Sequence, residues 1–256
     1  MAKNNKPVLV YVIKEEAQKM AVEHVYDIGG VTHKGGKETN SDLFHAGPKM
    51  ITVIDGGGRE DKGIAAAHEV LSLFREYERD AIEKPVQLKA LFRAAHALLK
   101  FNDEGVASAA ATVFKGNTAH VINVGHTAVF LWRKGKLNRL TPDHSLGAAF
   151  RAVGLSLRKG SNIAEISTTA LGSEMPKKLK LVKVRLRAGD RLILATNGLG
   201  NLPMPGIADV LSNQRSSDSK ATAKALVETS EAARNELRGK IHNTTVIVAD
   251  YLGKRR

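Results

Sequence analysis

One stretch of this chain combines a buried strand, a carboxylate and a run of glycines. Ile51-Thr52-Val53-Ile54 is rich in β-branched residues, and Asp55-Gly56-Gly57-Gly58 follows directly. A strand of this kind ends where the backbone can approach a neighbouring group closely, because glycine has no side chain. An ion or a phosphate beside Asp55 is one such neighbour. A tight strand-to-helix turn with Asp55 as its N-cap is the alternative.

The ligands available to an ion are limited by composition. The 256 residues include no cysteine, which excludes disulfides, thiolate zinc sites and a cysteine nucleophile. Any metal site must therefore use oxygen atoms or histidine nitrogens. With 43% hydrophobic and 25% charged residues, the composition is typical of a soluble globular protein, and we expect one domain over residues 1–256. The apolar run at residues 8–13 is short for a signal peptide or a membrane span, so we predict a cytoplasmic protein.

The charge balance favours acidic partners. Thirty-nine Lys and Arg residues against 26 Asp and Glu residues give a formal net charge of +13. Five basic residues alternate with apolar ones, with a phase slip that indicates a bulge: Lys178, Lys180, Lys183, Arg185 and Arg187. This basic row is typical of a solvated strand edge, where lysines discourage pairing, and a polyanion-binding surface is the alternative. With one tryptophan and four tyrosines, a dedicated binder of single-stranded nucleic acid is not supported.

The elements that must position these residues follow an α+β pattern. Strands are predicted at residues 8–13, 24–28, 43–46, 51–54, 110–114, 120–124, 129–132, 137–140, 178–187, 192–196 and 244–251. Helices are predicted at about residues 61–79, 86–101, 205–211 and 219–237. We expect a turn at Gly29-Gly30, an antiparallel meander over residues 110–140, a loop or flap over 141–178 and a basic tail over 252–256. In this order, helices must cover both outer faces of stacked sheets.

The order of the strand ends resembles the PPM family of metal-dependent protein serine/threonine phosphatases, the type 2C fold, over nearly the whole chain. The segments that carry the resemblance are Lys37-Glu-Thr-Asn40-Ser41-Asp42 for R-x-x-N-E-D, Val53-Ile54-Asp55-Gly56-Gly57-Gly58 for V-x-D-G-M-G-G, Gly116-Asn117 with Asn123-Val124-Gly125-His126-Thr127 for G-N and N-V-G-D-S, residues 140–145 for L-T-x-D-H-S, residues 169–172 for T-R-A-L-G, residues 189–199 for G-D-R-L-x-L-x-S-D-G-L, and His242-Asn243-Thr244-Thr245-Val246 for D-N-I-T-V. Each motif alone is unspecific, but all occur in the family's order. The resemblance implies a β-sandwich of two mostly antiparallel sheets with helices on both faces.

The same resemblance implies two Mn2+ or Mg2+ ions that activate a bridging water. In the family these ions are held by the aspartate of D-G, the glutamate of N-E-D and the aspartates of S-D-G and D-N. These four positions are Asp55, Ser41, Asn197 and His242 in this chain. Divalent ions need several anionic oxygens, and only Asp55 supplies a carboxylate.

Other positions of the family's cleft differ or are retained. The aspartate of G-D-S corresponds to His126, which removes a negative charge, and the phosphate-binding arginine corresponds to Lys37, which keeps the positive charge. Lys37 and a protonated His126 or His242 would repel divalent ions. Asp42, Gly56 and Asn243 match the family's residues. Without a metal-activated water the chain has no nucleophile, because cysteine is absent and Ser41 has no identified base.

We therefore predict a pseudophosphatase with no catalytic residue and no metal cofactor, which binds a phosphorylated or acidic protein partner and no membrane. A weak phosphatase that uses Mn2+ or Mg2+ is the first alternative. In its one-ion form, Asp55, His126 and His242 would hold a transition ion such as zinc or manganese. In the simpler interpretation, Asp55 accepts backbone hydrogen bonds and the histidines are solvated or hydrogen-bonded at strand ends. A binder of nucleic acid or another polyanion is the second alternative.

Overall fold

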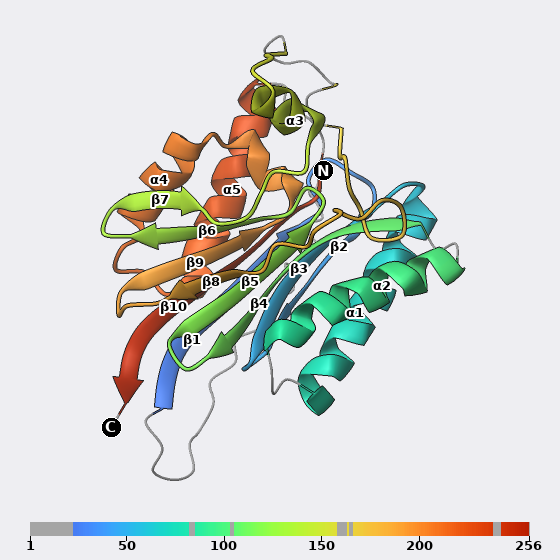
Figure 1. The fold of residues 1–256 in the computed structure, drawn as a ribbon. Coiled ribbons are helices and arrows are strands. Elements are labelled where there is room, and N and C mark those ends of the chain that lie inside the picture. Colours follow the sequence, from blue (N-terminus) through green and yellow to red (C-terminus); the bar gives the residue numbers. More distant parts are fainter. Residues whose placement is uncertain are drawn as a thin grey trace, which may run out of the picture.

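The chain forms a sandwich of two five-stranded sheets with helices on both outer faces (Figure 1). The computed structural model describes residues 23–81, 85–102, 105–157, 163, 166–237 and 242–255. Among these residues, the strands of both sheets pair antiparallel. The predicted α+β sandwich is thus confirmed, whereas the strand predicted at residues 8–13 lies outside the described residues.

The strands are distributed between the sheets in an order far from their order in the chain. The first sheet runs β1-β10-β9-β6-β7, and the second runs β2-β3-β4-β5-β8. The strands are β1 (Glu23–His33), β2 (Asp42–Ala46), β3 (Met50–Gly57), β4 (Val106–Lys115), β5 (Thr118–Val124), β6 (Ala128–Arg133), β7 (Lys136–Arg139), β8 (Val182–Arg185), β9 (Asp190–Ala195) and β10 (Thr244–Arg255). The helices are α1 (Glu60–Ala81), α2 (Leu88–Asn102), α3 (Leu146–Ala152), α4 (Met204–Asn213) and α5 (Ser219–Leu237), with 3-10 turns η1 (Pro85–Gln87) and η3 (Asn197–Asn201).

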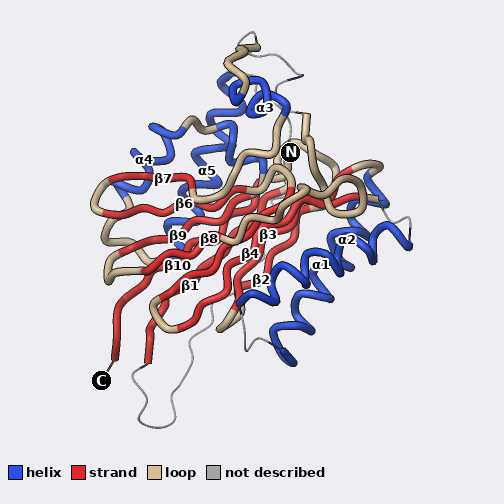
Figure 2. The backbone as a smooth tube through the Cα atoms, in the orientation of Figure 1, coloured by secondary structure: helices blue, strands red, loops and turns tan. Residues whose placement is uncertain are grey.

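Three apolar clusters hold the layers together. Helices α1 and α2 cover the second sheet, and α4 and α5 cover the first, so the strands lie between two helical layers (Figure 2). Successive residues of β3 show how one strand serves two clusters: Val53 packs between the sheets and Ile54 packs under the helices. This alternation explains why the central strands read as continuous apolar runs.

The predicted turn at Gly29-Gly30 is wrong, because both glycines lie inside β1. They pair with Val248 and Ile247 of β10. A Cβ added to Gly29 would lie 2.4 Å from the backbone nitrogen of Lys220, in the first turn of α5. These glycines therefore let a helix pack closely on a strand, a role that a local sequence pattern does not distinguish from a turn.

The predicted meander over residues 110–140 is divided between the two sheets. β4 and β5 belong to the second sheet, β6 and β7 belong to the first, and the chain crosses between them at residues 125–127. At the other end of the chain, β10 continues to Arg255 and pairs with β1, so residues 252–255 extend a strand instead of forming a tail. Within the described ranges, no helix combines the length and apolar character needed to cross a bilayer.

The predicted flap contains a helix, and the strand predicted at residues 178–187 is shorter in the structure, where β8 spans Val182–Arg185. The segment 141–178 contains the short helix α3. In the basic row, Leu179 packs under the helices while Val184 faces the space between the sheets. The phase slip therefore marks the point where the chain joins β8 at Val182, and the five basic side chains are exposed as predicted.

Candidate functional site at the strand ends

The predicted site residues gather at one end of the sandwich, where β1, β3, β5 and β9 end and β2, β4 and β10 begin. We call this region the strand-end site. Asp42 opens β2 and lies opposite Asp55 on β3. Asp55 in turn lies opposite Ser108 on β4, so these three residues form a row across the second sheet.

Asp42 and Asp55 form a pair of neighbouring carboxyl groups. Asp42 is 2% exposed, and its Oδ2 accepts a hydrogen bond from Thr196 Oγ1 at 2.6 Å. Its Oδ1 is buried and receives no hydrogen bond from the residues that the structure describes. Burial raises the pKa of Asp42 well above its ordinary value, and the charge of Asp55 raises it further. A proton shared with Asp55 would satisfy the buried oxygen.

Asp55 is the more acidic partner of this pair. Burial raises its pKa to about 6, and the opposing effects are the positive charge of Lys37 and a hydrogen bond with Asp42. Lys37 is half-buried in the loop that precedes β2, and its charge also lowers the pKa of Asp42. The arrangement favours an ionised Asp55 beside Lys37 and a protonated Asp42.

Asn243 fastens the loop before β2 to the start of β10. It is 2% exposed, and its Oδ1 accepts hydrogen bonds from both the backbone N–H and the hydroxyl of Ser41, each at 3.0 Å. Its Nδ2 donates to the carbonyl oxygens of Lys34 at 2.9 Å and Thr39 at 3.0 Å. The Ser41 hydroxyl is therefore committed to Asn243 within the protein.

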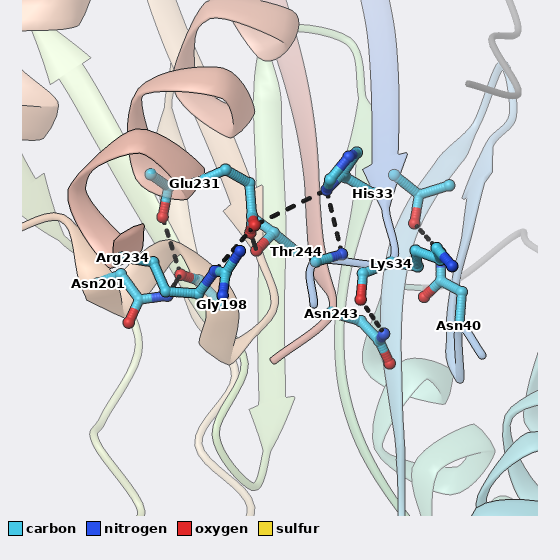
Figure 3. A network of polar contacts seen from close by, with 12 residues as sticks. His33, Lys34, Asn40, Gly198, Asn201, Glu231, Arg234, Asn243 and Thr244 are labelled. Atoms are coloured by element: carbon cyan, nitrogen blue, oxygen red, sulfur yellow. Dashed lines mark hydrogen bonds and ion pairs between the residues drawn. The ribbon is translucent and has the colours of Figure 1, made fainter. Parts of the chain in front are cut away.

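Glu231 of α5 organises the neighbouring polar network and was missed by sequence reasoning. Its Oε1 accepts a hydrogen bond from Thr244 Oγ1 at 2.8 Å, and its Oε2 accepts one from Arg234 at 3.0 Å. The same Oε2 lies 3.8 Å from Nδ1 of His33. Figure 3 shows the His33 and Glu231 side chains directed toward one another. In the sequence, Glu231 looks like any other charged residue on the solvated face of an amphipathic helix. Its burial in the tertiary structure shows that it organises these contacts.

Asn197 begins the 3-10 turn η3, beside Gly198. The Gly198 carbonyl accepts hydrogen bonds from Ser230 Oγ at 2.9 Å and Asn201 Nδ2 at 3.1 Å. A Cβ added to Gly198 would lie 2.2 Å from Thr244 Oγ1, so the glycine lets η3 pack directly against β10. His242 precedes this contact, and its carbonyl oxygen would lie 2.2 Å from a Cβ added to Gly35.

The close approach predicted at the glycine run is made by the protein itself. A Cβ added to Gly56 would lie 2.0 Å from the carbonyl oxygen of Gly63 in α1. The Gly56 N–H donates to the Ser41 carbonyl at 3.1 Å. Gly56 thus lets β3, α1 and the loop before β2 meet, and its lack of a side chain is explained without an ion or a phosphate.

His126 lies in the turn between β5 and β6, where several predicted motifs meet. Its N–H donates to Ser108 Oγ at 3.1 Å. The preceding Gly125 N–H points to His144 Nδ1 at 3.2 Å and to Thr169 Oγ1 at 3.3 Å. Burial lowers the pKa of His144; Asp143 opposes this shift, while Arg139 and His126 add to it.

The structure does not bring the predicted one-ion set together. In the part of the chain that it describes, no three His, Asp or Glu side chains are grouped so that they could hold a metal ion. Asp55, His126 and His242 all lie in that part. Asp55 instead has a second carboxyl group, Asp42, as its neighbour.

This architecture is shared with known phosphatases. The serine/threonine protein phosphatase PstP of Mycobacterium tuberculosis is 23% identical over 234 residues, covering 84% of this chain and 43% of PstP. The chain therefore spans less than half the length of the curated relatives it matches. The crystal structure of the PstP catalytic domain in complex with two manganese ions aligns with a TM-score of 0.76 at 23% identity, covering 90% of this chain and 100% of that domain. The PPM Ser-Thr phosphatase MsPP from Mycobacterium smegmatis gives a TM-score of 0.73 at 24% identity, covering 88% of this chain and 98% of MsPP.

This chain has the PPM phosphatase fold. No protein-family model matches its sequence. The PPM fold explains why motifs scattered over residues 37–246 meet at one end of the sandwich.

The donor set at the strand-end site does not fit the two ions that a PPM metal centre would hold. The Ser41 hydroxyl is bonded to Asn243, and Asn197 and His242 carry no negative charge at neutral pH. The remaining carboxyl pair has raised pKa values and lies near Lys37. Two divalent ions carry four positive charges, and this set offers at most two negative ones.

Proposed function

We propose that this PPM-fold protein is a pseudophosphatase that acts by binding a phosphorylated or acidic protein partner. The observation that supports the proposal is the internal pairing of the strand-end site. Ser41 is bonded to Asn243, Asp42 to Thr196, and Glu231 to Thr244. A site whose polar groups bind one another can keep its shape without an ion, but it lacks the charge to activate a water molecule.

The charge of the chain supports the choice of partner. A formal net charge of +13 favours association with negatively charged surfaces. The basic row from Lys178 to Arg187 is exposed, and Lys37 adds a half-buried positive charge at the strand-end site. Both regions complement acidic or phosphorylated segments.

The test combines metal content with turnover. Protein purified without chelator should contain less than one equivalent of Mn2+, Mg2+ or Zn2+ by mass spectrometry of the dissolved metals. Hydrolysis of p-nitrophenyl phosphate and of a phosphothreonine peptide should remain at background with either Mn2+ or Mg2+. Asp55→Ala is the matched control, because a true PPM activity depends on this carboxylate. Turnover that follows the protein through purification and disappears in Asp55→Ala would refute the proposal.

A weak, metal-dependent phosphatase is the second candidate. The observation that favours it is the pair formed by Asp42 and Asp55, because a buried carboxylate oxygen beside a second carboxyl group could accept a single cation in place of a proton. The two candidates differ in a thermal melt. The pseudophosphatase should show no stabilisation by Mn2+, whereas a one-ion site should give a saturable increase that is lost in Asp42→Asn.

A further inference from the structure

The strand β8 leaves one edge of the second sheet open. It is the last strand of that sheet, and among the described residues it pairs only with β5. The Leu186 N–H donates to the Asn117 carbonyl at 2.7 Å, so this opposed pair is hydrogen-bonded. Hydrogen-bonded pairs alternate with non-bonded pairs along an antiparallel ladder, so Val184 and Val182 bond to β5 as Leu186 does. Lys183 and Arg185, which lie between them, direct their backbone N–H and C=O groups away from β5.

An independent contact supports this direction. Nη2 of Arg133, at the end of β6 in the other sheet, donates to the Arg185 carbonyl at 2.8 Å. Arg133 also binds Asp190 through Nε at 2.8 Å, so its position is held by an ion pair. The N–H of Arg185 and both backbone groups of Lys183 thus face the open side of the strand.

This open side is bordered by a basic cavity. The cavity has a volume of about 550 Å³ and is lined by residues 183–187, Asn117 and Arg133. Lys183, Arg185 and Arg187 are exposed, whereas Val184 packs against the core between the sheets. Because Lys183 and Arg185 are two residues apart on one strand, their side chains lie on the same face.

The cavity is remote from the strand-end site. Arg185 lies opposite Thr118, the first residue of β5, whereas β5 reaches the strand-end site at Val124. At about 3.3 Å per residue, the length of β5 separates the two regions by about 20 Å. A ligand at β8 would therefore leave the strand-end site open.

We propose that the edge of β8 is the docking site for an extended acidic segment of a protein partner, which adds to the second sheet as a further strand. Backbone hydrogen bonds to Lys183 and Arg185 supply the pairing, and alternate Asp or Glu residues of the segment lie beside the two basic side chains. Lysine and arginine on an edge repel a second copy of the same strand, but they attract an acidic one. The inference rests on the proposed binding function and specifies the chemistry of its partner.

The geometry makes a specific prediction about the peptide backbone. The residue opposite Lys183 in an added antiparallel strand forms a hydrogen-bonded pair with it, and its side chain lies on the same face as that of Lys183. In a peptide in which glutamate alternates with threonine, the glutamate N–H groups should therefore point to β8. The threonine N–H groups should point to solvent.

The experiment measures binding of this dye-labelled peptide to the full chain by fluorescence anisotropy. N-methylation of the glutamate amides should weaken binding by at least about tenfold, because it removes donors and places methyl groups in the ladder. The peptide that is N-methylated at the threonine amides carries the same charge, and its affinity should stay within about twofold of that of the parent peptide. Equal affinities of all three peptides would overturn the proposal, as would absence of binding by the parent peptide.

Protein variants test the same edge from the other side. Lys183→Ala and Lys183→Pro lose the same charge, but only proline removes the outward N–H, which β5 does not use. Lys183→Pro should bind at least about fivefold more weakly than Lys183→Ala. The pair Lys183→Glu with Arg185→Glu should abolish binding. The matched pair Arg93→Glu with Lys100→Glu makes an equal charge change on the exposed face of α2 and should retain most of it.

Two further outcomes distinguish this inference from the alternatives. Duplex DNA would overturn the peptide site in favour of polyanion binding if it binds more tightly than the peptide, is displaced by salt, and binds equally well whatever its base sequence. Phosphatase activity in a protein that still binds the peptide at β8 would refute the pseudophosphatase proposal and leave the docking site standing. If the protein is metal-free and inactive but binds no acidic peptide, the docking site is overturned and the absence of phosphatase activity still stands.

Discussion

Asp42 and Asp55 face each other across β2 and β3 at the strand-end site. Both pKa values are raised by burial, and Lys37 is the cation near them. A proton and a lysine can offset the charge of two carboxyl groups, whereas two divalent ions would require several more anionic oxygens. This relationship determines how the protein should respond to pH and to restored carboxylates.

The carboxyl pair should make stability depend on pH. Because the folded-state pKa values are raised, the native state holds more protons than the unfolded chain above about pH 4. This contribution to stability is present at low pH and is lost as pH rises through about 6 for Asp55. Asp55→Asn removes one titrating group, so the variant should gain on the order of 2 kcal/mol relative to wild type between about pH 4 and pH 7.

Urea unfolding of both proteins over this pH range measures the difference. Histidine titrations affect wild type and variant alike and cancel in the comparison. A difference that is constant with pH, or that shifts toward wild type as pH rises, would contradict the raised pKa values.

Asn243→Ala should destabilise the protein by about 2–4 kcal/mol, because it leaves several buried groups without partners. The groups affected are the Ser41 N–H and hydroxyl and the carbonyl oxygens of Lys34 and Thr39. Ser41→Ala is the matched control, since it removes one of these hydrogen bonds and should cost about 1 kcal/mol. If urea unfolding gives equal costs for the two variants, Asn243 does not fasten the loop as described.

Gly56→Ala should cost more than about 3 kcal/mol, because its Cβ would collide with the backbone of α1. Gly58→Ala provides a control in the same glycine run. Gly58 has φ near +95°, but an added Cβ meets nothing within 4 Å, so only backbone strain of about 1–2 kcal/mol applies. Thermal and urea unfolding should rank the two variants in this order, and the reverse order would contradict the close approach of β3 to α1.

Restoring the carboxylates should restore metal binding. The combined variant is Ser41→Glu, Asn197→Asp and His242→Asp. In chelator it should melt below wild type, because the new charges repel Asp55 and the Ser41 hydroxyl bond to Asn243 is lost. Saturating Mn2+ should recover the melting temperature, while single substitutions should bind Mn2+ weakly because each ion needs several anionic ligands together.

Calorimetry with Mn2+ on the folded triple variant checks this prediction directly. Wild type in the same titration is the control and should give no heat beyond dilution. A folded variant that binds no Mn2+ would show that Ser41, Asn197 and His242 do not converge with Asp55 on one site.

The sequence by itself determined the fold class and most elements. The helix at residues 219–237 agrees with α5 at both ends, because its apolar spacing is local. The exposure of Lys183 and Arg185 followed from alternation along one strand, which is also local. The composition of the strand-end site was evident from the family's motifs, since each motif is contiguous.

Only the tertiary structure decided how these segments meet. Whether β5 and β6 share a sheet depends on their pairing with β4 and β9. Gly29 is explained by its contact with α5, a helix that begins 190 residues later, at Ser219. The hydrogen bonds of Asn243 and the burial of Glu231 are likewise long-range contacts. The reason is physical: the hydrogen-bonding capacity of a side chain is set by its type, but its partner is set by which distant strand lies opposite, and burial then decides its charge.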